Sequence, residues 1–164
     1  MRLFSLPIVF LLGSLVTGPA HADETIYILF RHAEKTTERP DPGLSEAGKK
    51  RAASIGAYLQ RMGVTRIFSS DYKRTRATVE PFSEATGISI EIYDPGDLDG
   101  FAETLSGMSG TIAISGHSDT TPELAALISG KATKPMPETD YDRLYTIIRT
   151  QDGETALNVS RLTP

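Results

Sequence analysis

The sequence predicts an α/β fold in which helices cover a largely parallel sheet. Short apolar runs alternate with segments of helical periodicity through most of the chain, which is the pattern of layered α/β domains. Several of these runs also end abruptly in arginine, histidine or serine. Because the carboxyl ends of parallel strands share one edge of a sheet, we expect those polar residues to line a common crevice.

The N-terminus has the three parts of a secretory signal peptide. Arg2 supplies the positive charge, Leu3 to Val16 is mostly apolar, and Ala20-His21-Ala22 is a small-x-small cleavage site. We therefore expect a signal peptide over residues 1–22, cleavage after Ala22, and one domain over residues 23–164. An uncleaved N-terminal anchor is the alternative, although the stretch is short and interrupted for a membrane span. The expected product is periplasmic or secreted, without stable membrane insertion after cleavage.

The first strand and helix have clear boundary signals. Thr25 to Phe30 is short, branched and aromatic, as buried strands are. The segment from Thr36 to Gly43 contains two prolines and is expected to be a loop. Ser45 is a good N-cap for a helix that runs to about Met62, and Gly63 ends it.

The middle of the chain repeats the strand-helix pattern. Arg66 to Ser69 is a short strand, and Tyr72 to about Ala85 is a helix whose last turn is disturbed by Pro81. Ile88 to Tyr93 alternates as a strand does. A short helix is expected near Phe101 to Leu105, after a loop rich in aspartate, proline and glycine.

The last third predicts three strands and one helix. Thr111 to Ser115 is a buried strand, and Pro122 suits the first position of a helix over Glu123 to Ser129. Tyr145 to Thr150 and Ala156 to Leu162 form a hairpin across an Asp-Gly turn, which we expect at an edge of the sheet.

Charge and cysteine content exclude several functions. The chain carries a net charge of −4 at neutral pH, so its overall balance gives no support for nucleic-acid binding. An anionic substrate would have to be attracted by a local cluster of arginines. There are no cysteines, which excludes disulfides, cysteine nucleophiles, thiolate metal sites and iron–sulfur clusters.

Arg31 and His32 stand directly after the first apolar run. A strand end holds an imidazole rigidly beside a fixed cation. Attack by histidine on a phosphoryl group needs this pair, because the arginine neutralises the phosphate oxygens. Alone, the dipeptide is a weak signal.

Two further strand ends carry related groups. Arg74 falls in the first turn of the helix after Ser69-Ser70, where free N–H groups already attract anions and a guanidinium can bind a phosphate in a bidentate manner. His117 follows the strand that ends at Ser115. His32 and His117 are the two histidines beyond the predicted cleavage site, and both occupy strand ends. Together these positions predict a phosphate pocket.

The spacing of these motifs resembles that of the histidine phosphatase superfamily, also called the phosphoglycerate mutase-like family. The resemblance covers about Ile26 to Leu127 and rests on Arg31-His32-Ala33-Glu34, Leu44-Ser45-Glu46-Ala47-Gly48 with Arg51-Ala52, Ser69-Ser70 through Arg74-Thr75 to Thr78, and Gly116-His117-Ser118. It implies a three-layer α/β/α sandwich with a largely parallel central sheet.

The resemblance also implies roles for matching residues. His32 is the expected nucleophile, which becomes phosphohistidine and is then hydrolysed by water. Arg31, Arg74 and His117 form the rest of the phosphate pocket, and His117 also takes part in catalysis. Glu34, two residues after His32, is expected to orient a pocket arginine. The reaction needs no metal and no cofactor.

The general acid is the open position. Asp119 follows the second histidine closely and is the first candidate, while Asp97, Asp99 and Glu103 precede it in the segment where many family members place their acid. For Asp97 and Asp99 a loop or helix-capping role is the simpler interpretation. A phosphoramidate or another substrate with a good leaving group would make a strong acid unnecessary.

Four other functions fit parts of the pattern. His32-x-Glu34 with His117-x-Asp119 could form a hydrolytic metal site, but two arginines would then face the cation. A serine hydrolase would need a glycine where Thr120 stands. A non-catalytic phosphate-binding module would keep the pocket without turnover. A phosphoglycerate mutase-type phosphotransferase is the fourth, although the short loops favour hydrolysis.

The substrate class follows from the pocket and the export signal. We expect a small phosphorylated molecule, for example an envelope sugar phosphate such as one of lipopolysaccharide. Compact family members of similar pattern include protein phosphohistidine phosphatases, but their substrates are cytoplasmic, so the compartment argues against that role.

Overall fold

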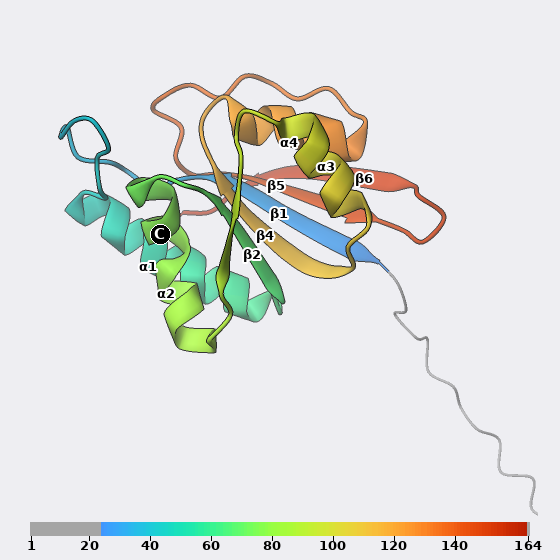
Figure 1. Ribbon diagram of the computed structural model, residues 1–164, viewed down its shortest axis with the longest axis horizontal. Helices are drawn as coiled ribbons and strands as arrows, with labels where there is room; N and C mark the ends of the chain where they lie inside the picture. Colours follow the sequence, from blue (N-terminus) through green and yellow to red (C-terminus); the bar gives the residue numbers. More distant parts are fainter. Residues whose placement is uncertain (1–23, 164) are drawn as a thin grey trace, which may run out of the picture.

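The computed structural model describes residues 24–163 as a three-layer α/β/α sandwich (Figure 1). This confirms the expected fold class. The predicted signal peptide and its cleavage site lie outside the described residues. Among the described helices, none is both long and apolar enough to cross a membrane.

The central sheet of the described chain has six strands in the order β3-β2-β4-β1-β5-β6. The strands are β1 (Thr25–Arg31), β2 (Arg66–Ser70), β3 (Ile90–Tyr93), β4 (Gly110–Gly116), β5 (Arg143–Arg149) and β6 (Thr155–Arg161). Strands β3, β2, β4 and β1 are parallel to one another. Strand β5 runs antiparallel to β1 and forms a hairpin with β6. The predicted terminal hairpin at a sheet edge is confirmed.

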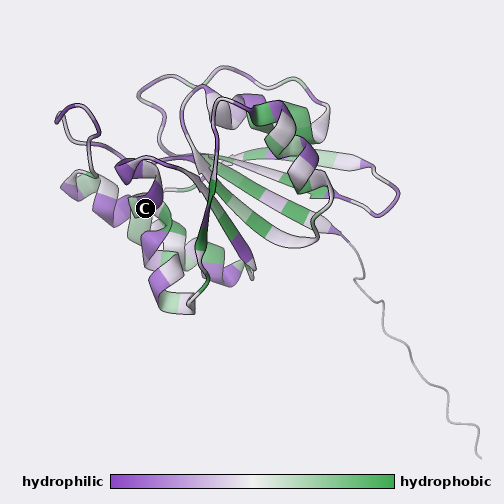
Figure 2. Cartoon of the chain, viewed as in Figure 1, coloured by the Kyte–Doolittle hydropathy of each residue, from purple (hydrophilic) through white to green (hydrophobic). Residues whose placement is uncertain are grey.

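Two pairs of helices cover the two faces of the sheet. The helices are α1 (Glu46–Arg61), α2 (Lys73–Thr86), α3 (Leu98–Ser106) and α4 (Thr120–Ser129). Alternate residues of β1 point to opposite faces: Ile28 packs with the α1 and α2 side, and Leu29 with the α3 and α4 side. Apolar residues accordingly concentrate between the layers, and polar residues predominate on the exposed faces of α1 and α2 (Figure 2).

The start of α1 agrees with the sequence prediction, whereas α3 and α4 begin earlier than predicted. Ser45 caps α1 as expected, its Oγ accepting from the Gly48 amide at 3.1 Å. Helix α3 begins earlier than expected because Asp97 caps it, its Oδ1 accepting from the Gly100 amide. Helix α4 also begins earlier, at Thr120.

The predicted place of Pro122 as first helical residue is therefore wrong. Asp119 is the N-cap of α4, and Pro122 is the third residue of the helix. A proline is tolerated there because the amides of the first turn have no partner within the helix.

The reversal of β5 has a consequence for the path of the chain. Helix α4 returns from the edge at which β4 ends, yet β5 must start beside the carboxyl end of β1, because Leu144 pairs with Phe30. Residues 130–142 therefore lead back across the molecule toward that edge, as the orange connection shows (Figure 1). The same edge holds the predicted site residues.

The packing of α1 against the segment after β1 gives a test of the fold. A Cβ on Gly48 would lie 2.1 Å from the Glu34 carbonyl oxygen, so no side chain fits there. We expect Gly48→Ala to lower the free energy of unfolding by about 2 kcal/mol or more, although Gly to Ala inside a helix normally stabilises. Urea or thermal unfolding measures this change.

Gly43→Ala is the matched control, since a Cβ there meets nothing within 4 Å. It should leave the unfolding midpoint nearly unchanged. Equal midpoints for the two variants would contradict the close approach of α1 to the backbone at Glu34.

Candidate active site

A polar pocket of about 260 Å³ opens at the carboxyl edge of the parallel strands. Its walls come from the ends of β1, β2 and β4, from the start of α2 and from the 130–142 connection. The lining residues are Arg31, His32, Lys35, Tyr72, Arg74, His117, Ser118, Asp119 and Glu138. The structure thus brings together all the predicted phosphate-pocket residues and the first candidate acid.

His32 is held in one tautomer. Its backbone amide extends the pairing of β1 with β4 by donating to the Gly116 carbonyl at 2.9 Å, and its side chain is only 2% exposed. The ring Nδ1 lies 2.7 Å from the Ala33 carbonyl oxygen. A carbonyl oxygen only accepts, so Nδ1 carries the hydrogen and the neutral ring leaves the lone pair on Nε2.

The surroundings of His32 keep the ring uncharged. Burial, followed by the charges of Arg31 and Arg74, lowers the pKa of His32 to about 3, against the opposing effect of the bond to Ala33. A buried neutral imidazole with a bare Nε2 is a nucleophile at physiological pH.

His117 lies beside His32, with ring centroids 5.6 Å apart. An arginine only donates, so the 3.3 Å contact from Arg74 Nη2 makes His117 Nδ1 an acceptor. His117 Nε2 then carries the hydrogen and donates to Ser70 Oγ at 2.8 Å, and Ser70 in turn donates to Thr75. This chain of hydrogen bonds fixes both the His117 ring and the position of Arg74.

His117 is also uncharged in this arrangement. Burial, and then the charge of Arg74, lowers the pKa of His117 to about 4. Both of its ring nitrogens already have protein partners. In the described pocket His117 therefore orients Arg74 through its acceptor nitrogen.

Arg31 is almost completely buried, with 1% of its side chain exposed. Its Nη1 donates to the carbonyl oxygens of Pro137, Glu138 and Asp140, the shortest being 2.6 Å to Glu138. Its Nη2 donates to Glu138 Oε2 at 2.7 Å, and the guanidinium carbon lies 4.2 Å from the centre of the Tyr141 ring. The 137–141 segment thus encloses one face of this cation.

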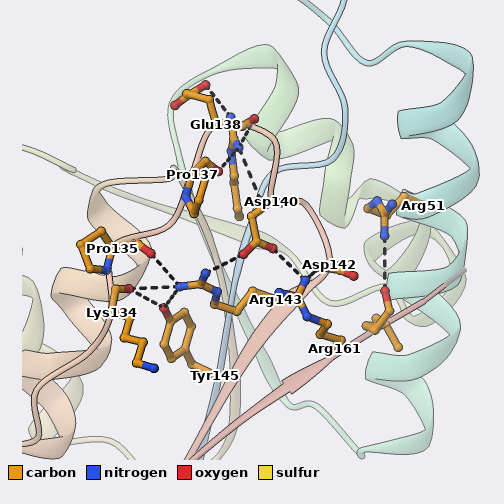
Figure 3. Close-up of polar contacts among 12 residues, drawn as sticks. Arg51, Lys134, Pro135, Pro137, Glu138, Asp140, Asp142, Arg143, Tyr145 and Arg161 are labelled. Carbon is orange, nitrogen blue, oxygen red and sulfur yellow. Dashed lines mark hydrogen bonds and ion pairs between the residues drawn. The ribbon is translucent and has the colours of Figure 1, made fainter.

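Ion pairs with arginines of the terminal hairpin hold the same segment in place (Figure 3). Asp140 is buried and pairs with Arg143 at 2.6 Å and with Arg161 at 3.3 Å. Arg161 also binds Asp142. These ion pairs hold the connection at the point where its carbonyl groups meet Arg31.

Arg74 approaches the pocket from the first turn of α2. Its Nη1 lies 3.5 Å from Asp41 Oδ1, and its guanidinium carbon lies 4.6 Å from the centre of the Tyr72 ring. The Nε atoms of both Arg74 and Arg31 are buried without a hydrogen-bond partner in the described structure. An unpaired buried guanidinium N–H is costly, and an oxyanion bound in the pocket would satisfy it.

The candidate acids separate into two groups. Asp119 lines the pocket, but its Oδ1 accepts from the Thr120 amide as the cap of α4. Asp97 caps α3, and Asp99 and Glu103 lie on that helix, outside the residues that line the pocket. The capping interpretation of Asp97 is confirmed.

Glu138 is a pocket residue that the sequence did not reveal. It lies in a proline-containing stretch that looks like an ordinary loop. The available signal was length, because a connection as long as residues 130–142 without secondary structure is uncommon and often functional.

Glu34 does not orient a pocket arginine, which corrects the expectation from the sequence. β1 ends at Arg31, and the Glu34 carboxylate instead binds Arg51 of α1 in a bidentate pair, with 2.8 Å between Arg51 Nη2 and Oε1. The alternative metal site included Glu34, and residues 24–163 contain no group of three metal-ligating side chains of that kind. Ser118, the nucleophile of the serine hydrolase alternative, donates its hydroxyl to Glu138.

A family comparison agrees with this geometry. The model of the histidine phosphatase superfamily (branch 1) matches residues 27–103, which include Arg31, His32 and Arg74. The matched segment is slightly less than half of the chain, and over it the sequence is similar to this family. The match ends before His117, Asp119 and Glu138. That these three residues line the pocket is therefore known from the structure and not from the family match.

One curated protein is similar to part of the chain. A probable phosphoglycerate mutase of Erwinia tasmaniensis is 33% identical over 67 residues, which are 41% of this chain and 31% of that protein. This chain therefore matches less than a third of that relative's length.

Solved structures resemble most of the chain. The protein histidine phosphatase SixA, solved with tungstate, aligns with a TM-score of 0.66 and 15% identity over 84% of this chain and 97% of its own. A mycobacterial glucosyl-3-phosphoglycerate phosphatase aligns with a TM-score of 0.68 and 13% identity over 85% of this chain and all of its own. At these identities the likeness establishes the fold.

The depressed histidine pKa values make stability depend on pH. Unfolded histidine binds a proton near pH 6.5, whereas folded His32 does so only near 3, so the unfolded state binds more protons between these values. Stability is therefore lost as the pH falls through this window. We expect His32→Asn to reduce the slope of unfolding free energy against pH by up to about 1.4 kcal/mol per pH unit.

Urea unfolding at several pH values between 6.5 and 4 measures both slopes. Carboxylates that titrate in the same range are common to the two proteins and cancel in the comparison. Identical slopes would show that His32 is not buried in a neutral state.

Proposed function

We propose that this chain is a metal-independent phosphatase that hydrolyses phosphomonoesters or phosphoramidates through a phosphohistidine intermediate on His32. The observation that carries the proposal is the bond from His32 Nδ1 to the Ala33 carbonyl, which leaves Nε2 free beside two arginines. The match of residues 27–103 to a superfamily of histidine phosphatases supports phosphoryl transfer as the reaction class.

The roles of the other residues follow from their chemistry. Arg31 and Arg74 would bind the phosphoryl oxygens and stabilise the charge that spreads over them during transfer. His117 holds Arg74 in place and lines the pocket beside His32, from where it completes the binding site. A carboxylic acid at the rim would protonate the leaving group, and Asp119 is the candidate that the sequence indicates.

Phosphotransfer of the mutase type uses the same first step. The two reactions differ in whether water or a second substrate accepts the phosphoryl group from His32. The match to a probable phosphoglycerate mutase favours neither outcome, because it covers 31% of that protein. The exposed side of the pocket, where Asp119 and Glu138 are open to solvent, favours water as the acceptor. Phosphate release in the absence of an acceptor molecule distinguishes the two.

The central test is substitution of the nucleophile. We expect His32→Ala to lower phosphate release by at least about 1,000-fold and to abolish acid-labile labelling by radioactive substrate. Vanadate should inhibit the unsubstituted protein by mimicking the transferring phosphoryl group. Lys50→Ala, an exposed position on α1, is the control and should retain activity.

Three outcomes would contradict the proposal. Activity that survives in His32→Ala would remove the phosphohistidine mechanism. Activity lost to a strong chelator and restored by a divalent metal would favour the metal-site alternative. Phosphate binding without turnover of any phosphomonoester would indicate a binding module.

We also propose that the enzyme acts outside the cytoplasm on small phosphorylated molecules such as an envelope sugar phosphate. The signal-peptide pattern of residues 1–22 supports export, and the modest volume of the pocket suits a small phosphorylated group. The fold neighbours named above are phosphatases, one of them named for a phosphorylated sugar derivative.

Processing of the N-terminus tests the proposed location. Expressed from its first methionine in a bacterium, the chain should be recovered from the periplasm or medium with Asp23 as its first residue. N-terminal sequencing measures this. Recovery in the cytoplasm with the first 22 residues retained would contradict export.

A further inference from the structure

Glu138 occupies a place in the pocket that its sequence context gave no reason to expect. Its Oε2 accepts from Arg31 Nη2 at 2.7 Å, and its Oε1 accepts from the Ser118 hydroxyl. The Lys35 ammonium lies 4.0 Å away. The side chain is 68% exposed, so these polar contacts and not packing determine where the carboxylate lies.

Asp119, the other pocket carboxylate, is held differently. It is exposed, and its Oδ1 is engaged by the Thr120 amide at 2.8 Å as the cap of α4. Within residues 24–163 it makes no ion pair with the pocket arginines or with Lys35. Of the two carboxylates, Glu138 is therefore the one in direct contact with a cation proposed to bind phosphate.

We propose that Glu138 is the general acid that protonates the leaving oxygen, an inference that rests on the proposed phosphatase function. A phosphoryl group bound to Arg31 must come within a few ångströms of this carboxylate, because both contact the same guanidinium. The exposed side chain can turn from Arg31 toward the leaving oxygen. Its attachment through Ser118 keeps it at the pocket rim.

Substrate binding would also supply the proton. In the free pocket, the hydrogen bond from Ser118 and the charges of Arg31 and Lys35 hold the pKa of the Glu138 carboxyl below its usual range. A phosphoryl dianion takes over the charge of Arg31 and repels the carboxylate. Both effects favour the protonated carboxylic acid, which is the form that the reaction requires.

The reaction balances in two steps. In the first, the His32 Nε2 lone pair bonds to phosphorus, the bond from phosphorus to the leaving oxygen breaks, and that oxygen takes the proton of Glu138. In the second, water attacks phosphorus and gives a proton to the Glu138 carboxylate. The bond between phosphorus and His32 Nε2 breaks, and its electron pair returns to the nitrogen. Alcohol and hydrogen phosphate are the products, and the enzyme is regenerated.

The dependence of rate on the leaving group tests this role. Glycerol 3-phosphate releases a strongly basic alkoxide that needs a proton, whereas p-nitrophenyl phosphate releases a weakly basic phenolate that does not. We expect Glu138→Gln to lower kcat for the alkyl ester by about 100-fold or more, and kcat for the aryl ester by less than about threefold. The plot of kcat/KM against pH for the alkyl ester should also lose its basic limb.

Two variants serve as matched comparisons. Glu103→Gln makes the same chemical change on α3, outside the pocket lining, and should leave both rates unchanged. Asp119→Asn should not produce the leaving-group-selective loss. Thermal unfolding of each variant controls for folding.

Other outcomes would overturn the inference. Equal losses for both esters in Glu138→Gln would indicate a binding role, and no loss would remove Glu138 from catalysis. A selective loss in Asp119→Asn would assign the acid to Asp119. In each of these cases the unsubstituted protein still hydrolyses p-nitrophenyl phosphate in a His32-dependent manner, so the proposed function stands. Absence of that hydrolysis in the unsubstituted protein would instead overturn the proposed function itself.

Discussion

The buried guanidinium of Arg31 is the group on which the geometry of the pocket depends. A permanent cation that is 1% exposed is stable only with close partners, and the 137–140 segment provides three carbonyl oxygens and a carboxylate. That segment is in turn held by the ion pairs of Asp140 with Arg143 and Arg161. Besides the backbone pairing of β1 with β5, the Arg31 side chain thereby links the end of β1, next to His32, to the segment that the terminal hairpin anchors.

The same cations serve two purposes in the site. By their charge they help to keep His32 neutral, and by their donors they can stabilise a phosphoryl group that gains charge. The hydrogen bond from His32 Nδ1 to Ala33 adds direction, because it leaves the lone pair on Nε2. In the proposed mechanism, the charges that keep His32 neutral are in place before the substrate binds.

Local signals made most of the fold predictable. Ser45 and the apolar periodicity after it define α1, and the branched residues of β1 with the abrupt Arg31 define the strand and its functional end. Helix α4 was placed too late because Pro122 suggested a first position, whereas the cap is Asp119. Glu138 could not be predicted, because its role depends on the path of a long connection and not on its neighbours in sequence.

The reversed direction of β5 changes what the carboxyl edge of the sheet can be built from. In an all-parallel sheet, this edge receives only the segments that leave strands, and each is tied to the helix that follows. Here it also receives a segment on its way into a strand (Figure 1). This segment is tied to β5 and β6 through Asp140, and it contacts β1 through the partners of Arg31. Changes in residues 130–142 that keep the carbonyl partners of Arg31 and the ion pairs of Asp140 would therefore alter one wall of the pocket while the parallel strands stay in place.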